Sequence, residues 1–350
     1  MPDRLGASAA GPQYNPCVAT PKQQRINPKS VPARRSNAGK SGRPGGRPPG
    51  VAKVRKATAR DWSGGARLQT LPLAIAPIAR GPAAAYVLPH EDAGSGWHWF
   101  RAILCLVVAL SLQIAVNFAN DYSDGIRGTD KHRVGPRRLT ASGAAKPRTV
   151  FAVALVFFGI AAIAGLIIVI RTQQWWLLAV GAVAIVAAYF YTGGKRPYGY
   201  FGLGELFVFV FFGIVATAGT TFVLAGTVTL ESWLAAVAIG LIACAVLMVN
   251  NIRDIEQDKL AGKRTLAVLI GNRASRIVFG ILLLAPFGIL AFFTLFYANA
   301  YLVYFALLAA IPAVGITISA RTSAELIVAL RLSALVALVY GLGLSWAIAF

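Results

Sequence analysis

Residues 102-AILCLVVALSLQIAVNFANDYSDGIRGTD-130 join a long apolar run to a short acidic segment. The apolar part, together with the residues just before it, is long enough to cross a bilayer as a helix, which takes about 20 residues. The acidic part holds three of the chain's thirteen carboxylates, at Asp121, Asp124 and Asp130. Because charge beside hydrocarbon is costly, acids in this position indicate a functional role.

Apolar runs recur along the rest of the chain, which is 57% hydrophobic and only 13% charged. This composition predicts an all-α integral membrane protein embedded in a lipid bilayer. Nine membrane helices are expected, at about 66–88, 98–118, 149–170, 175–192, 203–228, 233–251, 275–297, 299–320 and 332–350. Arg80 interrupts the first of them, which predicts either that its side chain reaches an interface or that this helix ends earlier.

The charges of the loops predict the orientation, because cytoplasmic loops accumulate Lys and Arg. Basic residues follow the second, fourth, sixth and eighth segments: Arg127, Lys131, Arg133, Arg137, Arg138, Lys146, Arg148, Lys195, Arg196, Arg253, Lys259, Lys263, Arg264, Arg273 and Arg321. The alternate loops carry only Glu91, Asp92, Arg171 and Glu231. We therefore expect a multi-pass protein of the cell membrane with a cytoplasmic N-terminus and an outer C-terminus.

The first sixty residues differ from the rest, with thirteen basic residues and one acid. A Pro- and Gly-rich composition of this kind cannot bury a core, so residues 1–60 are expected to be a disordered tail and residues 61–350 the membrane domain. We interpret the tail as a solvated extension, not as a nucleic-acid-binding arm. One hypothesis places the true start near Val51 or Val54, and N-terminal sequencing of the native protein tests it.

A second acidic segment, 250-NNIRDIEQDKLAGKRTL-266, follows the sixth apolar run. If both helices continue, the acids of each segment share one helix face with an asparagine. The two expected sets are Asn117, Asp121 and Asp124, and Asn250, Asp254 and Asp258. Magnesium takes oxygen ligands, typically one or two carboxylates together with water and substrate phosphate. The two segments therefore predict a magnesium and diphosphate site, the alternative being solvated acids paired with Arg127 or Arg253.

A third loop, 189-YFYTGGKRPYGYFGLGEL-206, supplies cations. Lys195 and Arg196 are candidates to neutralise a leaving diphosphate, with Tyr191 or Tyr198 as hydroxyl donors. The alternative is that these residues are ordinary interfacial anchors on the positive side of the membrane.

Over residues 62–350 these features resemble the UbiA-type membrane prenyltransferases. The stretches "NDYSDGIRGTD", "RVGPRRL" and "NNIRDIEQDKLAGKRTLA" are most similar to the menaquinone-pathway branch of that family. The resemblance implies a nine-helix bundle with cytoplasmic cap loops around a cavity, and it makes both Asn/Asp sets ligands of Mg2+. It further implies that Lys195, Arg196, Lys263 and Arg264 hold diphosphate and that Arg67 holds the carboxylate of an aromatic substrate. Asp130 departs from the family's usual spacing, which falls on Gly128, so its role is left open.

The implied reaction is Mg2+-dependent transfer of a polyprenyl group from polyprenyl diphosphate to 1,4-dihydroxy-2-naphthoate, with loss of carbon dioxide. Asp121, Asp124, Asp254, Asp258 and Lys195 are the expected catalytic residues. Acceptors such as 4-hydroxybenzoate or homogentisate stay open, because ring selectivity depends on the shape of the cavity.

Two other classes of membrane protein fit less well. A CDP-alcohol phosphotransferase would carry its acids in one run, whereas here they lie in two distant segments. A divalent-cation transporter would place carboxylates near the middle of the membrane, but only Glu205 lies inside a predicted helix, close to its cytoplasmic end.

Overall fold

The computed structural model describes residues 56–87, 95–132 and 138–350. These residues belong to one compact unit, Ala52–Phe350. The disorder expected for the tail falls on residues 1–55, outside the described residues. The expected boundary between residues 60 and 61 falls inside the first helix, which already begins at Ala59.

Every regular element in the described part of the chain is helical. In chain order these are α1 (Ala59–Ala66), η1 (Leu68–Thr70), α2 (Pro72–Val87), α3 (Ser95–Arg127), η2 (Thr129–His132), α4 (Pro147–Thr172), α5 (Trp176–Phe190), η3 (Tyr198–Tyr200), α6 (Gly204–Val208), η4 (Phe209–Ala218), α7 (Gly219–Ala225), α8 (Leu230–Leu260), α9 (Leu266–Phe296), η5 (Ala300–Ala306), α10 (Leu307–Ser319) and α11 (Ser323–Ala349). The predicted all-α class is confirmed.

Seven helical stretches among the described residues are long and apolar enough to span a membrane: Trp99–Arg127, Pro147–Thr172, Gly204–Ala225, Leu230–Leu260, Leu266–Phe296, Ala300–Ser319 and Ser323–Ala349. The two other predicted segments coincide with α2 and α5, which have 16 and 15 residues. Each predicted segment thus overlaps a helix, while the number of membrane crossings stays a prediction.

The helices that carry the acidic segments extend further than their apolar runs. The sequence predicted helix ends at residues 118 and 251, whereas α3 ends at Arg127 and α8 ends at Leu260. Hydropathy marks only the part of a helix that lies in hydrocarbon, and neither helix meets a stop signal there. Each stops just before a glycine with positive φ, Gly128 at 75° and Gly262 at 71°. Both acidic segments are therefore helical, as the predicted residue faces required.

The predicted start of the first membrane segment, at about residue 66, is wrong. Residues before Arg67 form the separate helix α1, which starts with a capping box between Thr58 and Asp61. Arg67 then adopts the left-handed conformation, with φ 53° and ψ 55°, and α2 begins only at Pro72. The alternative that this helix ends earlier is wrong, because α2 continues past Arg80 to Val87. The Arg80 side chain is buried within the protein, and its reach toward an interface stays a prediction.

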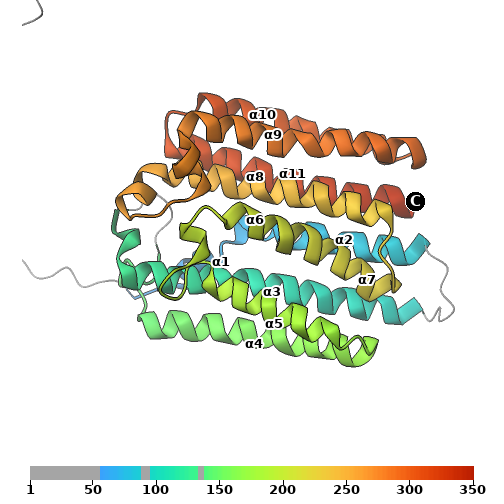
Figure 1. Cartoon of the computed structure of the whole chain (residues 1–350), viewed down its shortest axis with the longest axis horizontal. Coiled ribbons are helices and arrows are strands. Elements are labelled where there is room, and N and C mark those ends of the chain that lie inside the picture. Colours follow the sequence, from blue (N-terminus) through green and yellow to red (C-terminus); the bar gives the residue numbers. More distant parts are fainter. Residues whose placement is uncertain (1–55, 88–94, 133–137) are drawn as a thin grey trace, which may run out of the picture. The chain divides into compact units, whose positions relative to one another are not determined.

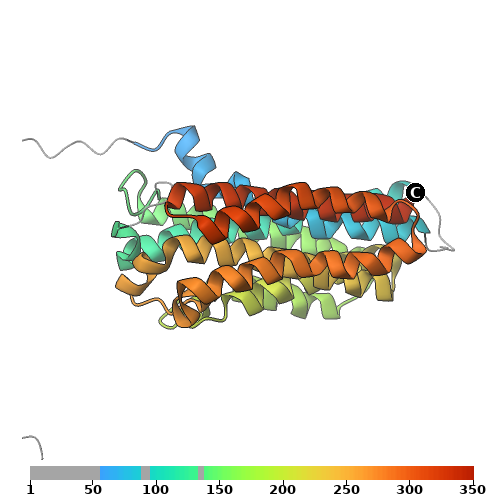
Figure 2. The same ribbon diagram turned by 90° about the horizontal axis from the view of Figure 1, so that it is seen from above.

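Figures 1 and 2 show the long helices running alongside one another, with α3 and α8 ending at the same end of the bundle. The core is centred on α8, which packs against α9, α11 and η4. The π-helix η4 crosses α8 very closely, since a Cβ on Gly213 would lie 2.6 Å from the Cα of Gly240. Small residues at such crossings are a common feature of helix packing in membranes. This arrangement brings two segments 130 residues apart in sequence to one end of the bundle.

Candidate active site

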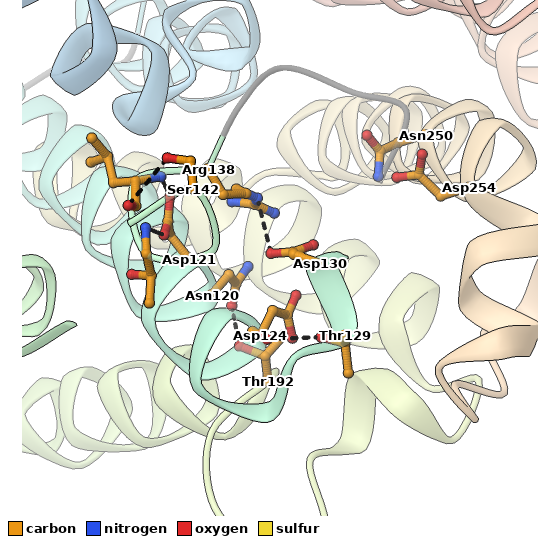
Figure 3. Close-up of polar contacts among 12 residues, drawn as sticks. Asn120, Asp121, Asp124, Thr129, Asp130, Arg138, Ser142, Thr192, Asn250 and Asp254 are labelled. Carbon is orange, nitrogen blue, oxygen red and sulfur yellow. Dashed lines mark hydrogen bonds and ion pairs between the residues drawn. The ribbon is translucent and has the colours of Figure 1, made fainter. Parts of the chain in front are cut away.

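A polar pocket lies where α3 and α8 end. Its lining includes four carboxylates (Asp124, Asp130, Asp254 and Asp258), three cations (Arg67, Arg138 and Lys263) and four amides (Asn120, Asn250, Asn251 and Gln257). Figure 3 shows residues from the end of α3 on one side and Asn250 and Asp254 of α8 across from them. The two acidic segments therefore meet, as the sequence predicted.

The first predicted set divides between two faces of α3. Asp124 lines the pocket together with Asn120, which the sequence analysis did not select. The Asn120 Oδ1 accepts a hydrogen bond of 2.6 Å from the Thr192 hydroxyl, which links α3 to the loop after α5. Asn117 and Asp121 are not among the pocket-lining residues. The asparagine and aspartate that share the pocket are thus one helical turn apart, at positions 120 and 124.

Asp121 anchors a loop in this structure. Its fully buried carboxylate accepts the backbone N–H of Leu139 at 2.9 Å and that of Thr140 at 2.8 Å (Figure 3). Gly125 makes room for the same loop, because a Cβ there would lie 2.3 Å from the Thr140 Cγ2. The metal-binding role predicted for Asp121 stays a prediction, and the contacts present indicate a carboxylate that holds the loop against α3.

Asn117 anchors a different segment. Its Nδ2 donates to the Ala66 carbonyl at 3.0 Å. Ala66 is the last residue of α1, directly before Arg67, whose side chain lines the pocket. Asn117 therefore fixes the backbone that presents Arg67, instead of lining the pocket itself.

Asp124 is held through both oxygens. The Tyr200 hydroxyl donates to Oδ1 at 2.7 Å, and the Lys263 Nζ donates to Oδ2 at 3.0 Å. Lys263 also lies over the Tyr200 ring, 4.7 Å from its centroid. Burial disfavours the charged ammonium, but the Asp124 carboxylate and Tyr200 outweigh burial and raise the pKa of Lys263. Lys263 is therefore a fully charged partner of Asp124.

All three members of the second set, Asn250, Asp254 and Asp258, line the pocket. Arg253 grips Asp254 with two hydrogen bonds, from Nε at 2.7 Å and from Nη2 at 2.6 Å, and its Nη2 also donates to the Asn250 Oδ1 at 2.9 Å. The side chains of adjacent helical residues normally point in different directions, so the Arg253 side chain must bend along the helix surface to reach Asp254. Asn250 and Asp254 are thereby held in place by a residue that does not itself line the pocket.

The cations predicted to bind diphosphate do not all reach the pocket. Lys263 lines it, whereas Lys195, Arg196 and Arg264 are exposed and are not among its lining residues. Their loops are fixed by other contacts: the Arg264 N–H donates to the Tyr200 carbonyl at 2.9 Å.

Tyr191 and Arg67, both singled out from the sequence, line the pocket. Tyr198 instead stacks on Phe207, with ring centroids 3.8 Å apart. Asp130 also lines the pocket and forms an ion pair of 3.5 Å with Arg138. The acid whose role was left open is therefore part of the same pocket.

Sequence reasoning missed several polar pocket residues, among them Asn120, Arg138 and Tyr200. Asn120 carried a usable signal, because its spacing to Asp124 equals that of Asn250 to Asp254. Arg138 belongs to the stretch RVGPRRL, which carries part of the family resemblance, but nothing in the sequence assigned either Arg138 or Tyr200 to the pocket, since both reach it only through tertiary folding.

The donor set suits a hard divalent cation. Carboxylate and amide oxygens dominate, and within the described ranges no three His, Cys, Asp or Glu side chains form a ready-made metal cage. This fits Mg2+, which usually binds through one or two carboxylates and completes its shell with water and substrate phosphate. The residues that would hold it are Asp124 on α3 and Asp254 and Asp258 on α8.

Comparison with known proteins agrees with this site. The family model "UbiA prenyltransferase family" matches residues 82–326. The 1,4-dihydroxy-2-naphthoate octaprenyltransferase of Mycobacterium tuberculosis is 46% identical over 292 residues, which cover 83% of this chain and 97% of that protein. The protein of the same name from Escherichia coli is 38% identical, covering 67% of this chain and 76% of its own length.

Solved structures share the fold. A UbiA homolog from Aeropyrum pernix superposes with a TM-score of 0.60 at 18% identity, covering 78% of this chain and 96% of that one. A UbiA homolog from Archaeoglobus fulgidus bound to GPP and Mg2+ gives a TM-score of 0.58 at 13% identity, covering 83% and 99%. The match of the family model over most of the chain and the close relatives lead to one conclusion: this chain belongs to the UbiA prenyltransferase family.

Proposed function

We propose that this membrane prenyltransferase transfers a polyprenyl group from polyprenyl diphosphate to 1,4-dihydroxy-2-naphthoate, a step of menaquinone biosynthesis, with Mg2+ as cofactor. The observation that carries the proposal is the pocket in which Asp124 of α3 lies across from Asp254 and Asp258 of α8, with Arg67 and Lys263 beside them. The relatives that bear the name of this activity support the choice of acceptor.

In the proposed reaction the allylic C–O bond of the donor breaks, the allylic carbon bonds to the carboxyl-bearing ring carbon, and diphosphate and carbon dioxide leave. Bound Mg2+ supplies Lewis-acid stabilisation of the negative charge that develops on the diphosphate. Lys263 adds a positive charge on the same side of the pocket, and preorganised charges of this kind are effective where water is excluded. The apolar helices next to the pocket exclude water and accommodate the isoprenoid tail.

We further propose that the pocket faces the cytoplasm and that nine helices cross the membrane. The helix ends and loops at the pocket end carry Arg127, Lys195, Arg264 and Arg321, whereas Arg171 and Glu231 lie at the other end. This asymmetry supports a cytoplasmic N-terminus by the positive-inside rule. In this orientation the diphosphate would lie at the membrane boundary and the tail among the helices.

The direct test is an assay in membranes that contain the full-length chain. We expect 1,4-dihydroxy-2-naphthoate, polyprenyl diphosphate and Mg2+ to yield demethylmenaquinol, which air oxidises to demethylmenaquinone during extraction and which mass spectrometry identifies in that form. Chelation of Mg2+ should stop its formation. Product with 4-hydroxybenzoate or homogentisate but not with the naphthoate would refute the proposed acceptor. Absence of any prenylated product would refute the proposed function as a whole.

Arg67 gives a sharper prediction about the acceptor. Replacing Arg67 with Gln should raise KM for 1,4-dihydroxy-2-naphthoate about 10- to 100-fold, because a hydrogen bond to a charged group contributes roughly 1.5–3 kcal/mol. KM for the polyprenyl diphosphate should not change, since Arg67 is expected to hold only the acceptor carboxylate. Steady-state kinetics with each substrate varied in turn measures both values.

Arg60, an exposed arginine on α1, supplies the matched control. Arg60→Gln should leave both KM values at the wild-type level. If Arg67→Gln instead raised KM for the donor, Arg67 would belong to the diphosphate site.

A further inference from the structure

Three carboxylates of the pocket each have a cationic side chain as a partner. The closest N–O distances are 3.0 Å from Lys263 to Asp124, 3.5 Å from Arg138 to Asp130, and 2.6 Å from Arg253 to Asp254. In this structure the protein's own cations neutralise carboxylates that a metal ion would otherwise neutralise. A divalent cation that binds Asp124 must therefore displace or repel a resident charge.

The three cations differ in how freely they can move. The Arg253 side chain is 2% exposed, lies on α8 and is not among the pocket-lining residues. Arg138 lines the pocket but is more deeply buried than Lys263, with a side chain 7% exposed. Lys263 lines the pocket, its side chain is 13% exposed, and it follows Gly262 in the turn between α8 and α9. Of the three, Lys263 is the cation best placed to leave its carboxylate and reach another anion in the pocket.

The resting position of Lys263 is well defined. Its Nζ lies over the Tyr200 ring and bonds the Asp124 Oδ2, while the Tyr200 hydroxyl takes Oδ1. Both oxygens of Asp124 are thus engaged by hydrogen-bond donors, and one of these donors carries a full positive charge. The positive charge of Lys263 repels a metal ion that enters without diphosphate, whereas a diphosphate offers the ammonium new acceptor oxygens.

We propose that Lys263 is a resident counter-ion that keeps metal from Asp124 until a diphosphate draws the ammonium away, so that metal and diphosphate bind cooperatively. The proposal rests on the proposed function, since it assumes that Asp124 takes part in a metal–diphosphate site. It assigns Lys263 two alternating partners: Asp124, as in this structure, and a phosphate oxygen once diphosphate binds. Metal then binds tightly only when the donor substrate is present.

The experiment compares two dissociation constants for the purified full-length protein. Mn2+, which suits the same oxygen ligands, is titrated alone and followed by its electron paramagnetic resonance signal. Labelled inorganic pyrophosphate is then titrated at saturating Mn2+. In Lys263→Gln we expect Mn2+ alone to bind about tenfold more tightly than in wild type and pyrophosphate about tenfold more weakly, within the usual range of coupling between sites.

Two further variants make the result specific. Lys259→Gln removes a lysine of the same helix end that pairs with Glu256 at 3.1 Å outside the pocket, and it should change neither constant. Lys263→Arg keeps the positive charge and should keep Mn2+ binding near the wild-type level. The conservative variant also shows whether any substitution at this position damages the fold.

The opposite signs of the two changes are the decisive feature. Mn2+ alone binding to Lys263→Gln no more tightly than to wild type would overturn the proposal. Weaker binding of both Mn2+ and pyrophosphate to Lys263→Gln would also overturn the proposal, because that result would indicate a merely structural role for the lysine. If wild type bound neither Mn2+ nor pyrophosphate under any condition, the proposed function itself would fail.

Discussion

Asp124→Asn should abolish prenyl transfer, lowering kcat/KM by about 10³-fold or more, because removing one preorganised electrostatic contact already costs about 10²- to 10³-fold. The substitution removes the one carboxylate of α3 that lies on the pocket wall beside both Tyr200 and Lys263. The asparagine oxygen can still accept from the Tyr200 hydroxyl, and Lys263 can turn toward solvent, so the fold should persist. The transfer assay in membranes and the thermal unfolding midpoint in detergent measure the two effects.

Glu256→Gln is the matched control for this prediction. Glu256 lies on α8 among the acids of the second set, but its side chain is 75% exposed and pairs with Lys259. This variant should keep wild-type activity. Full activity in Asp124→Asn would show that Asp124 takes no part in the proposed reaction. Asp254 is a poorer choice for this test, because its loss would leave the buried Arg253 without its carboxylate, which is itself strongly destabilising.

Asp121→Ala should lower the free energy of unfolding by on the order of 4 kcal/mol. The change leaves the backbone N–H groups of Leu139 and Thr140 without their buried acceptor, and each unsatisfied buried group costs about 1–3 kcal/mol. Activity should fall as a consequence, because the same loop carries Arg138 to the pocket wall. Denaturant titration of the purified protein measures the change in stability.

Asp121→Asn separates the two roles considered for this residue. Its single side-chain oxygen can accept one of the two N–H groups, so about half of the lost stability should return. Wild-type stability of Asp121→Ala combined with loss of Mn2+ binding would contradict the anchoring role. That result would place Asp121 among the metal ligands, as the sequence first predicted.

Local sequence predicted the helices well, since apolar runs of sufficient length leave a membrane chain few other options for its backbone. It failed at their ends for a definite reason. Hydropathy changes where hydrocarbon ends, whereas α3 and α8 continue for two more turns until Gly128 and Gly262. The same additional turns carry the acids, so the error in the boundaries affected the part of the chain that matters most for function.

The site shows the same division between local and tertiary information. In α8, periodicity alone selected Asn250, Asp254 and Asp258, and all three line the pocket. In α3 the same reasoning selected Asn117 and not Asn120, although both precede an aspartate by four residues, and only packing shows that Asn120 is the one turned to the pocket. Lys195 and Arg196 were chosen for their charge, but the loop leaves them exposed.

The sequence by itself determined that this chain is a helical membrane protein with two acidic segments at helix ends, because residue composition and helical periodicity are local properties. Tertiary structure alone decided that Asp124 lines the pocket while Asp121 holds a loop, and that Tyr200 and Lys263 bind the same carboxylate. These contacts join residues from 18 to 139 positions apart. No local pattern encodes such pairings, because they depend on how the helices and their loops pack against one another.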